Sequence, residues 1–170
     1  RIGREAEDLF ARRKYFRALI RFTALEDHAG TAECHLRLKH SDEAARYFKL
    51  AGDFESAGMI YHKLKDYKSA MECFLKSEAD EKDGYPMAKQ AARKVRDIRW
   101  VCTQARNLFE TGFYQKALAL FSILGYAEPE IGICLKRMND EAGWRKAWSR
   151  VTRLEDYSRL IDICLSQDEV

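Results

Sequence analysis

The chain has 170 residues, of which 46% are hydrophobic and 34% are charged, and its formal net charge is +3. This balance is typical of a folded protein and excludes an intrinsically disordered chain. The small net charge neither requires nor excludes an acidic partner. No run of 18 apolar residues occurs, so we expect no membrane span.

Alanine and leucine are abundant, β-branched residues are few and only two prolines interrupt the chain, which favours helix nearly everywhere. In the first half, apolar residues at helical spacing predict six short helices joined by tight turns. They are expected at residues 3–12, 15–24, 29–38, from Ser41 to the turn at Gly52, 54–64 and 67–75. Ser41 and Asp66 are predicted N-caps, and Gly52 is predicted to end its helix.

A polar stretch after Lys76 interrupts this pattern. We expect a loop at residues 77–85, which separates regular short repeats at 1–77 from less regular repeats at 86–170 within a single array. Further helices are predicted at residues 86–96, 98–110, 114–124, 129–138, 141–151 and 156–165. The total is eleven or twelve helices and no strand, which predicts an all-α fold.

One motif recurs along these helices: an aromatic residue, an alanine three positions later, and another aromatic residue four positions beyond that. The copies are Tyr15-Ala18-Phe22, Phe54-Ala57-Tyr61, Tyr67-Ala70-Phe74 and Tyr114-Ala117-Phe121, with weaker copies at 41–48 and 144–151. These offsets place all three side chains on one helical face, and the alanine lets a neighbouring helix approach closely. The alanines recur about every 13 residues, so two helices form a hairpin of about 26 residues that must stack on its neighbours.

Two segments resemble the tetratricopeptide repeat. In the first, Gly58 and Tyr61 precede the Tyr67-Ala70-Phe74 motif at the spacing of that family, and in the second, Ala105 and Leu108 precede Tyr114-Ala117-Phe121 and Pro129. The period is nearer 26 residues in the first half and 30 in the last, against 34 in the family. The chain is therefore more similar to the short-helix arrays of coatomer and intraflagellar-transport scaffolds. The resemblance implies a right-handed α-solenoid of antiparallel helical hairpins that binds other proteins.

By this resemblance, the inner surface formed by the first helix of each hairpin would bind a peptide or a helix. The residues that it implies at this surface are Arg37, Met59, His62, Lys63, Arg99 and Arg106. Because most of them are basic, we expect an acidic helix or tail as the partner. The chain begins with Arg1, so we expect it to be a fragment of a larger protein.

A second hypothesis is nucleic-acid binding by a helical accessory region of a helicase-like motor. Lys89, Arg93 and Arg96 follow four- and three-residue steps and so are predicted to share a helical face, with Arg99 close by. Such a basic stripe could contact phosphates. The alternative is an ordinary solvated helix face, which the modest net charge favours.

No nucleotide-binding, nucleophile-elbow or zinc-protease motif occurs, so we expect no enzymatic activity, no cofactor and no metal site. The five cysteines lie far apart and form no C-x2-C pair. We expect them to be reduced, buried small hydrophobes, which indicates an intracellular, cytoplasmic location.

Overall fold

The computed structural model describes residues 2–77, 85–124 and 128–149. Within these ranges it contains eleven α-helices and no strand, which confirms the all-α prediction. The contacts divide the chain into two compact units, unit 1 (Arg1–Ala79) and unit 2 (Asp80–Val170). That residues 1–170 form one continuous array stays a prediction.

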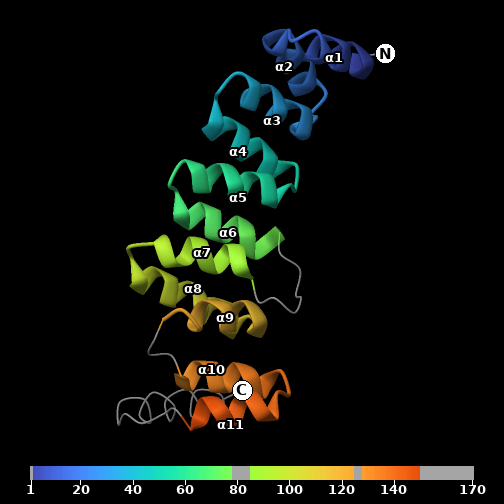
Figure 1. Ribbon diagram of the computed structural model, residues 1–170. Coiled ribbons are helices and arrows are strands. Elements are labelled where there is room, and N and C mark those ends of the chain that lie inside the picture. The colour runs from blue at the N-terminus through green and yellow to red at the C-terminus, as the bar shows by residue number, and fades with distance from the viewer. Residues whose placement is uncertain (1, 78–84, 125–127, 150–170) are drawn as a thin grey trace. The chain divides into compact units, whose positions relative to one another are not determined.

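Unit 1 is a linear series of six helices whose first residues lie 13 positions apart. They are α1 (Ile2–Ala11), α2 (Tyr15–Ala24), α3 (His28–Arg37), α4 (Ser41–Leu50), α5 (Phe54–Lys63) and α6 (Tyr67–Ser77). Each helix packs against the next and runs antiparallel to it (Figure 1). The first and last helices do not pack together, as they would in a closed bundle. Unit 1 is therefore a solenoid-like array of three hairpins, each formed by an A helix (α1, α3, α5) and a B helix (α2, α4, α6).

Every connection in unit 1 has three residues, and its middle residue adopts the left-handed conformation. These middle residues are Arg13, Glu26, Lys39, Gly52 and Lys65, with φ between 54° and 81°. The third residue of a connection can hydrogen-bond to the helix before it and cap the helix after it. For example, the backbone N–H of Asp53 donates to the carbonyl of Phe48 at 2.9 Å, and its Oδ1 accepts from the N–H of Ser56 at 3.0 Å. Asp53 thus ends α4 and caps α5, which explains a repeat of ten helical residues and three turn residues.

The helix caps differ from the prediction at one position. Asp66 caps α6 as predicted, because its Oδ1 accepts from the N–H of Ser69 at 3.2 Å. Gly52 follows α4 with φ 81°, also as predicted. Ser41, however, is the first residue of α4, and the N-cap position belongs to His40, whose side chain makes no capping hydrogen bond. The predicted Ser41 cap is wrong, because the fixed three-residue turn places the cap one residue earlier.

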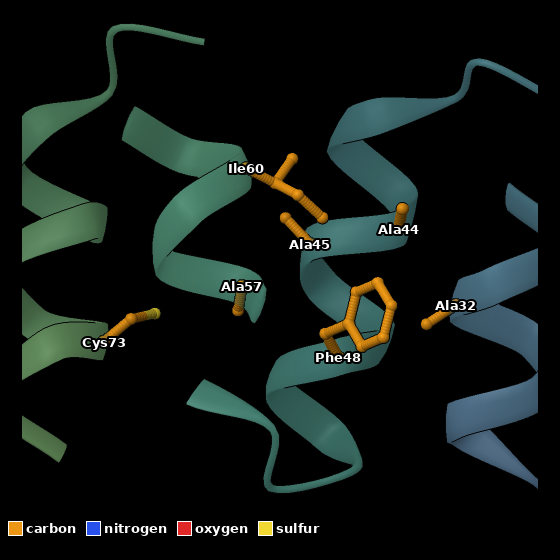
Figure 2. Packing of buried hydrophobic residues seen from close by; sticks show 7 residues of the cluster. All are labelled: Ala32, Ala44, Ala45, Phe48, Ala57, Ile60 and Cys73. Carbon is orange, nitrogen blue, oxygen red and sulfur yellow. The ribbon is translucent and has the colours of Figure 1, made fainter. Parts of the chain in front are cut away.

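The core of unit 1 consists of small residues on facing helices and large rings between them. Ala18, Ala44 and Ala70 occupy the fourth position of the B helices and are fully buried. Small residues at the fifth position of the A helices face them: Ala6, Ala32 and Gly58. The eighth position of each B helix carries a buried phenylalanine: Phe22, Phe48 and Phe74. Figure 2 shows the ring of Phe48 directed toward Ala32. The prediction that the motif alanines are close-contact points is confirmed.

Unit 2 contains α7 (Pro86–Lys94), α8 (Ile98–Glu110), α9 (Tyr114–Phe121), α10 (Glu128–Arg137) and α11 (Glu141–Trp148). Two hairpins, α8–α9 and α10–α11, pack through α9 and α10, and α7 contacts α9. Their turns carry left-handed Gly112 and Asn139, as in unit 1. Ala117 is fully buried at the fourth position of α9, whereas buried Ala147 is only the seventh residue of α11. The predicted helix at 156–165 lies outside the described residues.

Candidate protein-binding surface

The candidate residues of unit 1 come from equivalent positions of two A helices. Arg37 is the last residue of α3 and Lys63 is the last residue of α5, 26 residues later, and both are exposed. Met59, one helical turn earlier in α5, leaves 45% of its surface exposed. His62 is half-buried, and its ring lies 5.4 Å from that of Tyr67 in an edge-to-face contact. The repeat therefore presents these side chains on one side of α3 and α5.

The spacing between Arg37 and Lys63 follows from the order of packing. Helix α4 packs against both α3 and α5, so α3 and α5 lie at most two interhelical distances apart. With about 8–10 Å between neighbouring axes, this upper limit is about 16–20 Å. An extended peptide covers that distance with about five or six residues. A partner must therefore be extended across the helices, or be a helix that lies across them, to contact both basic groups.

Exposed residues that sequence reasoning missed complete this surface. Leu36 of α3, equivalent to His62 of α5, is 39% exposed. The turns that follow α1, α3 and α5 carry Arg13, Lys39 and Lys65 at their left-handed positions. The turns at the opposite ends of the hairpins carry Glu26 and Gly52 instead, so basic residues mark one edge of unit 1. A search at a period of 26 residues would have found both sets. We define the A-helix surface as Leu36, Arg37, Met59, His62 and Lys63.

Arg99 and Arg106 belong to unit 2. Both lie on α8, seven residues apart, so they share one face of that helix, and both are exposed. They form a pair of their own, because the equivalence that relates Arg37 to Lys63 is a repeat within unit 1.

The predicted basic stripe at 89–99 is divided between two helices. Lys89 and Arg93 lie on α7, and Arg99 lies in the first turn of α8. Helix α7 ends at Lys94, and Val95 is extended with ψ 119° and buried. The prediction that Arg96 shares a helical face with Lys89 and Arg93 is therefore wrong, because Arg96 follows a residue that leaves the helix. The prediction failed because the buried valine ends α7 two residues before Arg96.

Two buried cysteines of the core have raised pKa values. Burial, followed by the carboxylates of Glu33 and Asp27, raises the pKa of the Cys34 thiol to about 11. Burial, followed by the Glu130 carboxylate, raises the pKa of Cys134 to about 12. Thiols with these values are poor nucleophiles at neutral pH. Among the described residues, no group of three or more His, Cys, Asp or Glu side chains converges to hold a metal ion.

Among the described residues of unit 1, His35 carries the one buried side-chain nitrogen or oxygen atom that has no hydrogen-bond partner. Its Nδ1 atom is buried and has no hydrogen-bond partner. Its ring stacks on Tyr47 with 5.3 Å between centroids and 11° between planes, and it lies 5.8 Å from the ring of His40. Burial and the neighbouring His40 lower its pKa below 6.5, and Glu43 offsets part of this effect. The stack joins α3 to α4.

The fold defines the class of the protein: an all-α protein built of helical hairpins, which form a solenoid-like array in unit 1. The chain matches no protein-family model, no curated protein and no solved structure. Each described helix is too short or too polar to cross a membrane.

Proposed function

We propose that the chain is a non-enzymatic scaffold of the tetratricopeptide-like type, whose A-helix surface binds an acidic peptide or helix of another protein. The observation that supports the proposal is that α3 and α5 both carry an exposed basic and an exposed apolar side chain near their carboxyl-terminal ends. Each helix ends in an exposed basic residue, Arg37 or Lys63, with an exposed apolar side chain, Leu36 or Met59, within one turn of it.

This combination suits an acidic segment that also carries apolar residues. The guanidinium of Arg37 can accept a carboxylate in a bidentate geometry, whereas the ammonium of Lys63 acts as a point charge. Neighbouring Leu36 and Met59 add apolar contact area, and a methionine adapts its shape to different partner side chains. Acidic groups up to about 16–20 Å apart would contact both helices at once.

The test uses a fluorescent, acidic peptide of about 20 residues with leucines about six positions apart, matched to this spacing. We expect the peptide to bind to the chain in a fluorescence anisotropy titration. The double variant Arg37→Glu, Lys63→Glu should weaken binding about tenfold or more, which corresponds to about 1.4 kcal/mol. The control is Arg46→Glu, a single charge reversal on the exposed surface of B helix α4, and it should leave the affinity nearly unchanged.

Equal affinity for the wild type and the double variant would refute the A-helix surface. A single-stranded oligonucleotide of similar length tests the second hypothesis, which is nucleic-acid binding. Binding of that oligonucleotide that falls steeply with salt, and that is lost on changing Lys89, Arg93 and Arg99 to glutamate, would favour nucleic-acid contact instead.

A further inference from the structure

Helix α2 exposes large apolar side chains at positions where the other two B helices, α4 and α6, carry charged residues. Phe16 and Ile20 leave 66% and 55% of their surfaces exposed. They lie four residues apart and so share one face of the helix, and exposed Ala24 extends the row by one more turn. This face points away from the core of unit 1.

The other B helices provide an internal comparison, because the repeat places their residues in the same setting. Phe16 is the second residue of α2 and Ile20 is the sixth. The same positions hold Asp42 and Arg46 in α4, and Lys68 and Glu72 in α6. The fold therefore tolerates charge at both positions, and the packing of unit 1 does not require the apolar residues of α2.

Charges of opposite sign lie at the two ends of this apolar row, apart from Arg21 in the last turn of α2, which pairs with Glu5 of α1 at 3.2 Å. Arg13, Lys14 and Arg17 stand at the amino-terminal end of α2, and Glu26 and Asp27 follow its carboxyl-terminal end. All five are exposed. An identical helix that lies antiparallel against α2 would bring the basic end of each copy over the acidic end of the other. A parallel arrangement would bring like charges together.

We propose that the exposed face of α2 binds the same face of a second copy of this chain, as an antiparallel, two-fold symmetric helix pair. With Ile20 of both copies at the symmetry axis, Phe16 of one copy meets Ala24 of the other. A large ring then packs into the space above a small residue, as in the ridges-into-grooves packing of helices. In the same register, Lys14 faces Glu26 and Arg13 faces Asp27. A two-fold contact needs a self-complementary surface, and the α2 face satisfies this requirement in both shape and charge.

The size of the surface determines the strength of the dimer. One short helix from each copy buries less than the roughly 800 Å² per partner of a standard interface. We therefore infer a weak, reversible dimer. Sedimentation velocity from about 1 µM to about 1 mM covers the range in which such a dimer forms. The weight-average mass of the chain should rise from that of a monomer toward that of a dimer.

Two variants test the apolar contact. Ile20→Glu places two carboxylates at the symmetry axis and should keep the chain monomeric over the whole range. Leu50→Glu is the matched control, because Leu50 is 64% exposed on α4 and lies outside the proposed contact. It should dimerise like the wild type. Both substitutions are at exposed positions, so circular dichroism should show unchanged helicity.

Charge exchange tests the register. Lys14→Glu alone and Glu26→Lys alone each create two like-charge contacts in the dimer and should weaken it about tenfold or more. When these two variants are mixed, every one of these contacts joins opposite charges, so a heterodimer should form. The double variant Lys14→Glu, Glu26→Lys should also recover self-association.

Three results would overturn the proposal: a wild-type chain that stays monomeric to about 1 mM, an Ile20→Glu variant that dimerises like the wild type, or a mixture that forms no heterodimer. A monomeric chain that binds phosphatidylserine vesicles through Ile20 would assign this face to a membrane surface instead. Peptide binding at the A-helix surface is a separate readout, so either proposal can fail without the other.

Discussion

Replacing Gly58 by alanine tests the packing of the hairpins most directly. A Cβ atom at Gly58 would lie 2.6 Å from Cε1, 2.8 Å from Cδ1 and 3.1 Å from Cζ of Phe74. Carbon atoms in contact prefer separations of about 3.5–4.0 Å, so the methyl group would overlap the ring by about 1 Å. The ring cannot move into solvent, because only 2% of the Phe74 surface is exposed.

The magnitude follows from two opposing effects. Overpacking of this kind costs about 1–3 kcal/mol. The higher helix propensity of alanine returns about 1 kcal/mol. Because three ring atoms are overlapped, we expect the cost to lie at the upper end, and Gly58→Ala to lower the free energy of unfolding by about 1–2 kcal/mol.

Gly132→Ala is the matched control within α10. Its Cβ would lie 3.8 Å from both the Cβ of Ala147 and the Cδ1 of Trp144, which is ordinary van der Waals contact. Only the propensity effect remains, so this variant should be more stable than the wild type by about 0.5–1 kcal/mol. Urea unfolding followed by circular dichroism would measure all three proteins, and hydrogen exchange would show which helices open first.

A second variant distinguishes ring overlap from a general effect on α5. Phe74→Leu removes the ring atoms that the new methyl group would meet. Combined with Gly58→Ala, it should give a loss smaller than the sum of the two single losses by about 1 kcal/mol or more. If Gly58→Ala stabilises the chain as much as Gly132→Ala does, or if the two losses are additive, the proposed contact between α5 and α6 is wrong.

Three further predictions concern other features of the chain. Gly52→Ala should lower the free energy of unfolding by about 1–2 kcal/mol in a urea titration, because Gly52 has φ 81°, a conformation that alanine disfavours. Since the new Cβ would meet no other atom, backbone strain is the only cost, and an unchanged free energy would contradict the left-handed turn. Iodoacetamide at about pH 8 should modify half-buried Cys102 long before Cys134, because the pKa of Cys134 is raised to about 12. Peptide mass spectrometry would measure the two rates, and equal rates would contradict the burial of Cys134. Because the pKa of His35 is lowered below 6.5 by burial and by His40, the unfolded chain binds more protons than the folded chain as the pH falls through 6.5. The free energy of unfolding should therefore decrease below this pH, and His35→Phe should reduce that decrease; identical pH profiles would refute the assignment.

The class of fold was predictable from the sequence because its causes are local. Helix α2 begins at Tyr15 and ends at Ala24 as predicted, since its apolar residues follow helical spacing and the turn residues end it. Burial of Ala18, Ala44 and Ala70 was predictable as well, because the offsets of the motif place the alanine and the aromatic residues on one face.

The candidate surface was predictable only in part. Arg37 and Lys63 were predicted as matching positions of two hairpins, because the 26-residue period is visible in the sequence. The exposure of Leu36 beside Arg37 was known only from the structure. Arg96 was misplaced, because α7 ends at Lys94 and buried Val95 is extended, although no glycine or proline marks this end in the sequence.

The amino-acid sequence by itself thus determined that the chain forms short helices in a regular series, because propensity, turn signals and apolar spacing act within about 13 residues. Only the tertiary structure decided which faces stay uncovered. Phe16 and Ile20 are as apolar as core residues. Helical spacing places them on the face of α2 opposite to Ala18 and Phe22, but it does not determine whether another helix covers that face. Their exposure follows from the direction in which α1 and α3 approach α2, which is a property of the packed array.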